Sequence, residues 1–296
     1  MNVDTITGTG LSDAFEQAVE RAAEVTVRVD GRGRMAASGI LWSAGVVLAT
    51  DHTLERDEDI GVTLPDGTTI AASIAGRDPG SDLAVLRLER ESGTGTFITA
   101  PLPKIGSIVL AVGRPRELGA SAGIVSSLGG PWRSRSGGRI AGLIRPDLTM
   151  YPGFSGGPLV NLQGDVIGIN TSGLRGGALT IPLDAAATIV EQLLAHGRLK
   201  RGYLGLTSQP VRLPESVTST AGQATGLLVV GIEPESPADT AGAFIGDILL
   251  ALGDDPLRDT DDLRAVLGSE RSGQPVELHI LRGGTMQRLS VTIGER

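Results

Sequence analysis

The chain has 296 residues, 40% of them apolar, which is enough for one large or two modest domains with a core. Its formal net charge of −8 argues against binding nucleic acid through a basic surface. Cysteine is absent, which excludes disulfides, thiolate metal sites and cysteine nucleophiles. The histidines are scattered (His52, His196 and His279), so we expect no metal site, and we expect no cofactor.

The first residues, Met1 to Thr7, have neither the basic nor the apolar region of a secretion signal. No uninterrupted apolar run approaches the roughly 20 residues that span a bilayer. We therefore expect a chain without a membrane segment and, as the chain stands, with a cytoplasmic location; the alternative is a leader removed ahead of this sequence.

The pattern in chain order begins with a helix over residues 12–24, in which Phe15 and Val19 repeat at helical spacing. Two series of short strands follow, without amphipathic helices between them. Such a pattern favours a pair of antiparallel barrels over an α/β sheet. The expected strands are 25–29, 36–42, 46–50, 60–64, 69–74 and 83–88, then 108–112, 121–128, 140–144, 158–160, 166–171 and 178–181.

A long helix is predicted from Asp184, as its N-cap, to Gly197. A basic linker, 198–201, leads into a unit with two short helices, near 237–241 and 261–267, among about five strands. We therefore expect an N-terminal helical segment over 1–23, a first domain over 24–199 and a second over 200–296.

The stretch Gly153 to Leu159 places Ser155 among three glycines and a proline. Such a turn exposes a hydroxyl beside unpaired backbone N–H groups, which is what acyl transfer requires. The alternative is an ordinary glycine-rich turn. The stretch also matches the Gly-x-Ser-x-Gly nucleophile elbow, but that elbow leads into a helix, and here a strand follows. We therefore disfavour an α/β-hydrolase.

His52 closes a predicted strand, Asp82 opens another, and Ser155 follows in the second series of strands. Each residue alone is more often structural. The order His, Asp, Ser is nevertheless that of the two-barrel serine proteases. The spacing puts His52 and Asp82 on the first barrel and Ser155 on the second, so they can meet only between the barrels.

Four motifs then resemble the high-temperature-requirement A (HtrA) family of serine proteases. They are Asp82–Leu86, Gly123–Gly129, Pro152–Leu159 and Val166–Thr171, and Ser236–Ala238 with Gly246–Leu249 looks like the family's PDZ domain. The resemblance implies a mainly β chain, with a chymotrypsin-like double barrel followed by a small α+β PDZ domain. It also implies endopeptidase activity on unfolded or exposed polypeptides, in protein quality control.

The resemblance implies a role for each matching residue. Ser155 is the expected nucleophile, His52 the base and Asp82 its orienting partner, and the N–H groups of Gly153 and Ser155 form the oxyanion hole. By position, Thr171, Ala178 and Leu179 line a small apolar specificity pocket. Phe154 and Tyr151 depart from the family pattern, in which Asn is common at both places. A bulky pair there either plugs the site or widens its apolar surface.

In the second domain, Gly202 to Leu206 resembles a carboxylate-binding loop, whose N–H groups bind the C-terminus of a peptide. The expected peptide-binding residues are Tyr203, Leu204, Gly205, Leu206, Leu263 and Val266. The alternative is a plain strand start. The loop 129–138, with Trp132 among arginines, lies where the family carries a sensor loop, and its Trp either forms a contact surface or folds back on its barrel.

Two readings of the whole chain stay open: an active endopeptidase, and a catalytically weak PDZ adaptor or chaperone. A homotrimer is implied by the resemblance alone, because Phe15 is the only aromatic residue before Trp42.

Overall fold

The computed structural model describes residues 8–33, 35–92, 97–130, 132–133, 139–140, 142–174, 177–200, 202–267 and 271–295. The chain divides into two compact units, Met1–Leu199 and Lys200–Arg296. Among the described residues, no helix has the length and apolar character needed to cross a membrane.

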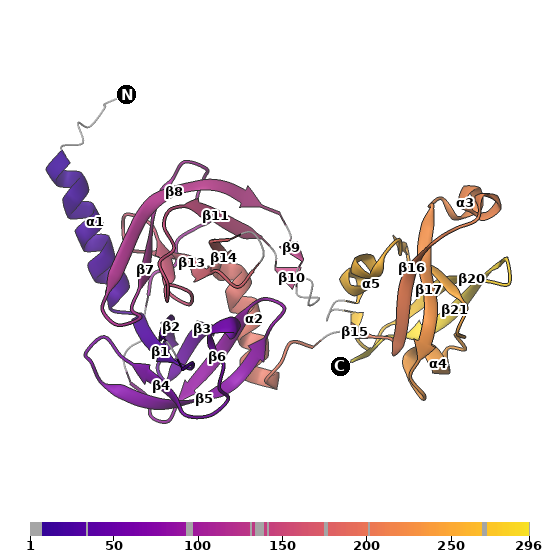
Figure 1. Cartoon of the computed structure of the whole chain (residues 1–296), viewed down its shortest axis with the longest axis horizontal. Helices are drawn as coiled ribbons and strands as arrows, with labels where there is room; N and C mark the ends of the chain where they lie inside the picture. Colours follow the sequence, from indigo (N-terminus) through magenta and orange to yellow (C-terminus); the bar gives the residue numbers. More distant parts are fainter. Residues whose placement is uncertain are drawn as a thin grey trace. The chain divides into compact units, whose positions relative to one another are not determined.

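The first unit contains two closed six-stranded antiparallel barrels, drawn in indigo to magenta in Figure 1. The first barrel has the order β1-β2-β3-β6-β5-β4 and the second β11-β14-β13-β12-β7-β8. Their strands are β1 (Thr26–Asp30), β2 (Ala37–Ser43), β3 (Val46–Thr50), β4 (Ile60–Thr63), β5 (Thr69–Asp78), β6 (Leu83–Leu88), β7 (Ile108–Gly113), β8 (Gly119–Gly129), β11 (Leu143–Asp147), β12 (Pro158–Val160), β13 (Val166–Thr171) and β14 (Leu179–Pro182). The expected double barrel of antiparallel strands is thereby confirmed.

The strands at the junction of the barrels are buried along their whole length because both of their faces are covered. All five residues of β3 are buried. Val47 and Ala49 pack inside the first barrel, whereas Val46 and Leu48 belong to a separate core shared with the second barrel. β13 is likewise buried along its whole length. A period-2 pattern is therefore lost at the strands that carry the site.

Two helices cover this junction. α1 (Gly8–Ala23) contacts β1, β7 and β12, and α2 (Leu183–His196) packs on β5 and β6 of the first barrel and on β13 and β14 of the second (Figure 1). α2 ends as predicted at Gly197, in the left-handed conformation. Its N-cap is Pro182, so the expectation of Asp184 as the cap is wrong: Asp184 already lies in the first turn. α1 likewise begins at Gly8, four residues ahead of the expected start.

Short elements complete the first unit. A 3₁₀ turn, η1 (Asp51–Thr53), follows β3, and β9 (Trp132–Arg133) pairs with β10 (Arg139–Ile140). The expected strand 140–144 is therefore split between β10 and β11.

The second unit has a sheet of order β16-β17-β18-β20-β21, with β19 paired to β18 and a separate pair, β15 and β22. Its elements are β15 (Gly202–Tyr203), β16 (Leu206–Arg212), α3 (Glu215–Ala221), β17 (Thr225–Ile232), α4 (Pro237–Thr240), β18 (Ile248–Leu252), β19 (Asp255–Pro256), α5 (Thr260–Val266), β20 (Pro275–Arg282), β21 (Thr285–Thr292) and β22 (Gly294–Glu295). Both predicted helices are present, and α3 was not predicted. Asp259 caps α5 by accepting from the N–H groups of Asp261 and Asp262.

Candidate active site

His52 and Asp82 come together because their strands are paired. β3 and β6 run antiparallel, with Thr50 opposite Leu83, so the residue after β3 lies beside the residue before β6. The N–H of Asp51 donates to the carbonyl of Asp82 at 3.1 Å, which extends the pairing to the positions next to the site. Hydrogen bonding within the sheet thus places the two side chains.

The carboxylate of Asp82 is buried and bonded to His52 and to a residue of the second barrel. Oδ1 accepts from the backbone N–H of His52 at 2.9 Å, and Nδ1 of His52 lies 2.9 Å from Oδ1 and 2.8 Å from Oδ2. Oδ2 also accepts from Oγ1 of Thr171. Asp82 has a φ of 59°, a conformation that Asp tolerates better than most residues and that occurs often at functional sites. The imidazole is therefore fixed at its Nδ1 edge, while His52 keeps 30% of its side chain exposed.

Ser155 lies in a turn that only glycines permit. Gly153 and Gly156 have φ values of 87° and 89°, and a Cβ on Gly156 would lie 2.0 Å from the carbonyl oxygen of Ser38. The N–H of Gly156 donates to the carbonyl of Asn170 at 2.8 Å, which aligns the turn with the end of β13. Among the described residues, no acceptor takes the N–H groups of Gly153 or Ser155. Two donors are therefore available beside the Ser155 hydroxyl.

The hydroxyl of Ser155 is bonded to the segment after β13. Its Oγ lies 3.0 Å from Oγ of Ser172 and accepts from the Ser172 N–H at 3.2 Å. In the described part of the chain, no hydrogen bond joins Ser155 to the ring of His52. His52 and Asp82 are thus paired while Ser155 is held by Ser172.

Gly173 lies directly over the His52–Asp82 pair. A Cβ there would lie 2.5 Å from Nδ1 of His52 and 2.6 Å from Oδ2 of Asp82. Its N–H donates to Oγ1 of Thr171 at 3.0 Å, so Thr171 fixes this backbone and Asp82 at once. The three residues after Asn170 therefore cover the pair from the second barrel.

Phe154 does not plug the turn. It is 4% exposed and packs in the core of the second barrel, where its ring lies against Gly113 and Gly119. Tyr151 is half exposed, and its ring meets that of Phe154 edge to face at 5.5 Å. The space that Phe154 needs is provided by the missing side chains of two glycines.

The residues expected in a specificity pocket have different surroundings. Thr171 is fully buried and bonded to Asp82, and Leu179 is 2% exposed, whereas Ala178 is half-buried. Most of the expected sensor loop, including the side chains of residues 131–139, lies outside the described residues.

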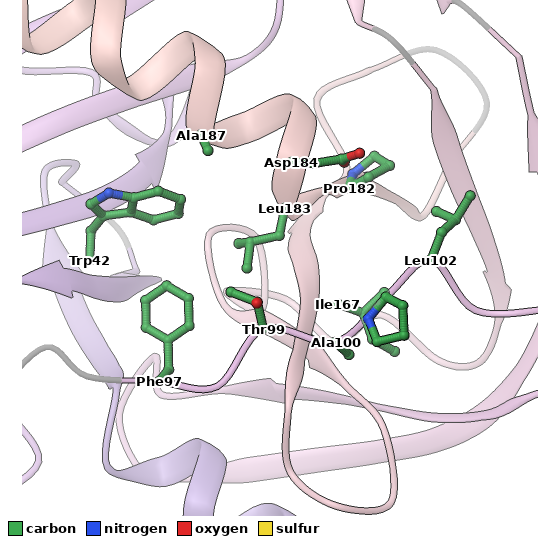
Figure 2. Close-up of a pocket in the computed structure, with 11 residues that line it drawn as sticks. Trp42, Phe97, Thr99, Ala100, Leu102, Ile167, Pro182, Leu183, Asp184 and Ala187 are labelled. Carbon is green, nitrogen blue, oxygen red and sulfur yellow. The ribbon is translucent and has the colours of Figure 1, made fainter.

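A separate apolar pocket of about 290 Å³ lies by the segment that joins the barrels (Figure 2). Trp42 and Phe97 form one wall, with their rings 5.6 Å apart and edge to face, and Leu183 of α2 also lines it. None of the expected catalytic or peptide-binding residues lines this pocket.

In the second unit, β16 is an edge strand of its sheet and contacts α5. Gly205, just before β16, has a φ of 73°, and the N–H groups of Leu204 and Gly205 donate to no described acceptor. Leu204 and Leu263 are buried in the core of the unit, whereas Leu206 and Val266 lie at its border. The hydroxyl of Tyr203 donates to the carboxylate of Glu233. The strand edge, the helix and the loop thus lie together.

Three residues of the site are not among those expected from the sequence: Ser172, Gly173 and Ser38. The backbone N–H of Ser38 donates to the carbonyl of Ser155 at 3.1 Å. No sequence signal marks these residues, because their partners are far away along the chain. Thr171 was noticed, although its bond to Asp82 was not foreseen.

Family models match two parts of the chain: a trypsin-like peptidase domain over residues 37–169 and a PDZ domain over residues 202–293. A probable periplasmic DegP-like serine endoprotease of Ectopseudomonas mendocina (strain ymp) is 34% identical over 299 residues, covering 96% of this chain and 62% of the relative. A protein of the same description from Rhizobium meliloti (strain 1021) is 32% identical over 280 residues, covering 90% of this chain and 55% of that relative.

Solved structures similar to this chain are also serine proteases. The HtrA-type protease AlgW with a decapeptide has a TM-score of 0.73 at 26% identity, covering 95% of this chain and 98% of that one. The serine endoprotease from Yersinia pestis has a TM-score of 0.74 at 29% identity, with the same coverage. The chain combines a trypsin-like peptidase domain with a PDZ domain and is similar to HtrA-type serine proteases along nearly its whole length. The double barrel followed by a PDZ domain, expected from the sequence, is confirmed as its fold.

The expected cytoplasmic location is wrong, because relatives of this chain are named periplasmic. The error came from reading the first residues of the sequence as evidence of compartment. The chain spans 62% of the length of the Ectopseudomonas relative, so the relatives' full activity belongs to longer proteins.

Proposed function

We propose that the chain is a serine endopeptidase in which Ser155, His52 and Asp82 form the catalytic triad. The observation that carries the proposal is the buried Asp82 carboxylate bonded to Nδ1 and the backbone N–H of His52. That contact leaves Nε2 as the nitrogen that exchanges protons. Ser155 lies in the adjoining turn, beside two N–H groups without a described acceptor.

The chemistry follows from these positions. His52 Nε2 takes the proton of Ser155 Oγ as Oγ attacks the scissile carbonyl, and the oxyanion that forms is stabilised by the N–H groups of Gly153 and Ser155. The C–N bond then breaks, and the amine leaves with the proton from His52. Water, deprotonated by His52, hydrolyses the acyl-enzyme and restores Ser155. Ser155 must first leave Ser172 and turn towards His52.

Labelling with a fluorophosphonate probe tests the triad. Wild-type protein should form a covalent adduct at Ser155 and cleave unfolded casein. Ser155→Ala should do neither, and Asp82→Asn should lower kcat by roughly 10⁴ because it leaves the imidazole in the wrong tautomer. Full casein cleavage by purified Ser155→Ala would contradict the assignment.

The substrates we propose are unfolded or exposed polypeptides, acted on in protein quality control. The names of the relatives support an endoprotease of the periplasm. We also propose that small or medium aliphatic residues are preferred at P1, with Thr171, Ala178 and Leu179 beside the pocket. A library varied at P1 tests this preference, and strong selection of arginine would contradict it.

For the PDZ domain, we propose binding of peptide C-termini as an added strand on β16, with the carboxylate at the loop 203–206. The available N–H groups of Leu204 and Gly205 support this site. Titration with peptides carrying a free or an amidated C-terminus tests it, because amidation should abolish binding.

The alternative function is a catalytically weak PDZ adaptor. It drew its support from Phe154 and Tyr151, and the burial of Phe154 in the barrel removes most of that support. A homotrimer is a further proposal that rests on the family alone, and light scattering tests it.

A further inference from the structure

Ser38 of β2, in the first barrel, is fully buried. Its backbone and its side chain contact the turn of Ser155 in the second barrel. Its N–H donates to the carbonyl of Ser155 at 3.1 Å, and its Oγ lies 2.7 Å from the carbonyl oxygen of Gly153. Its own carbonyl oxygen lies against Gly156, where a Cβ would come within 2.0 Å. One residue thus contacts three positions of the turn.

The direction of the hydroxyl proton follows from a fourth contact. The backbone N–H of Arg114, just after β7, donates to Ser38 Oγ at 2.8 Å. An N–H can only donate, so Ser38 Oγ accepts there and its single proton is left for the carbonyl of Gly153. The hydroxyl is therefore a fixed donor to the turn.

This donor acts on the peptide unit between Gly153 and Phe154. Ser38 holds its carbonyl, and its N–H donates to the carbonyl of Tyr151 at 3.0 Å. The two candidate oxyanion donors, the N–H groups of Gly153 and Ser155, flank this unit on either side. The torsions on either side of this unit, ψ of Gly153 and φ of Phe154, set how the two flanking N–H groups are directed relative to each other, so a hydrogen bond that fixes the unit keeps the two donors convergent.

The side chain of Arg114 fixes the backbone whose N–H donates to Ser38 Oγ. Its guanidinium donates to the carbonyls of Thr26 at 2.8 Å and Ala23 at 3.0 Å, at the start of β1 and the end of α1. No carboxylate among the described residues pairs with it, and burial lowers the pKa of Arg114. The backbone that donates to Ser38 is thus anchored to the first barrel.

We propose that Ser38 is a positioning residue for the oxyanion hole: its hydroxyl fixes the Gly153–Phe154 peptide so that the N–H groups of Gly153 and Ser155 converge. The proposal rests on the endopeptidase function above. It differs from a packing role, because removal of the hydroxyl should weaken binding of the tetrahedral state and leave binding of the substrate unchanged.

The variants are Ser38→Ala, which removes the hydroxyl, and Ser38→Cys, which keeps a side chain of similar shape with a weak donor. Thr26→Val is the matched control, since Thr26 is also fully buried and its hydroxyl donates to a backbone carbonyl, that of Ala22, at 2.6 Å. The variant keeps the backbone carbonyl of Thr26 that accepts from Arg114. All are assayed as the full chain, below the lowest Tm of the set.

Both Ser38 variants should lose about 10- to 100-fold in kcat on a fluorogenic peptide, with KM unchanged, since losing an oxyanion donor outright typically costs roughly 10²–10³. Affinity for a peptide boronic acid, which forms a tetrahedral adduct with the serine, should fall by the same factor. In a Ser155→Ala background, Ser38→Ala should leave the affinity for the substrate peptide unchanged. Thr26→Val should keep the wild-type kcat.

Two results would overturn the proposal. One is wild-type kcat and boronate affinity in Ser38→Ala. The other is a loss of activity in the Ser38 variants that matches Thr26→Val and follows the folded fraction, which would show a purely structural role. Failure of the proposed function looks different, because the wild-type protein itself would then neither react with a fluorophosphonate nor cleave the peptide.

Discussion

The hydroxyl oxygens of Ser155 and Ser172 lie 3.0 Å apart, and the Ser172 N–H also donates to Ser155 Oγ. A serine that attacks a carbonyl has to give its proton to a base, and Ser172 is not a base at neutral pH. The contact therefore holds the proposed nucleophile in a resting arrangement, from which it must be released before each reaction.

Replacing Ser172 by Ala should therefore raise activity. The variant loses one hydrogen bond of about 0.5–1.5 kcal/mol that stabilises the resting arrangement, which corresponds to a rise of roughly 2- to 10-fold in kcat/KM. The initial rate of labelling by a fluorophosphonate measures it without a peptide substrate. Ser172→Thr keeps the hydroxyl and is the control. A fall in the labelling rate of Ser172→Ala would show instead that Ser172 assists the reaction.

Gly173→Ala should abolish activity and leave the fold intact. Its Cβ would lie 2.5 Å from His52 Nδ1 and 2.6 Å from Asp82 Oδ2, so the pair and the added methyl cannot keep their places. We expect at least about 10²-fold loss in kcat, because the imidazole would be displaced from its acceptor. Gly33→Ala is the control, since a Cβ there meets nothing within 4 Å. Wild-type kcat in Gly173→Ala would mean that the 171–173 segment lies elsewhere during catalysis.

Arg77 supports the turn that carries His52. Its guanidinium donates to Asp51 at 2.5 Å and to the carbonyl of Leu54 at 3.2 Å, and the bond to Asp51 raises the pKa of Arg77. Arg77→Ala should lower kcat several-fold and the free energy of unfolding by about 1–2 kcal/mol, since charge-assisted bonds at a partly exposed site contribute amounts of this order.

Denaturant unfolding and peptide cleavage measure the two effects of Arg77→Ala. Arg56→Ala is the matched control, because Arg56 pairs with Asp30 on the same barrel at 3.4 Å without touching η1. Equal changes in kcat for both variants would contradict a role for Arg77 in placing His52.

The PDZ domain should lose stability in acid through Asp247. Burial opposes its charge, but the guanidinium of Arg282 at 2.7 Å and the N–H of Phe244 outweigh burial and lower the pKa of Asp247. Because the pKa is lower in the folded state, the charged carboxylate stabilises the domain above about pH 4, the unfolded value. That contribution is lost as the pH falls through the folded value.

Asp247→Asn should therefore cost about 1.5–3 kcal/mol at pH 7, and its stability should change less between pH 7 and pH 3. Both tryptophans, Trp42 and Trp132, lie in the first unit, so hydrogen exchange of β18 and β20 is the suitable measurement. Asp254→Asn is the control, since Asp254 is exposed and has no ion-pair partner among the described residues. An unchanged acid response in Asp247→Asn would contradict this account.

The order of short apolar runs, turns and polar residues along the chain predicted most of the fold of the first unit. Short apolar runs between glycines and turns indicated two barrels, and the order of His52, Asp82 and Ser155 indicated a site shared between them. The predicted strand over 140–144 differs from the structure, in which these residues belong to the end of β10 and the start of β11. The helix α3 was not predicted because its residues show too little apolar periodicity.

The sequence by itself determined the double barrel, because hydrophobic periodicity and turn glycines are local properties, and it showed His52, Asp82 and Ser155 in the order of the two-barrel serine proteases. The PDZ domain followed from the resemblance of its motifs to a known family. Only the tertiary structure decided that Phe154 packs inward, that Thr171 bonds Asp82, that Ser172 holds Ser155 and that Ser38 bonds the turn of Ser155. Each of these contacts joins different strands or loops, and their distances depend on how the two barrels close and pack, which no local pattern records.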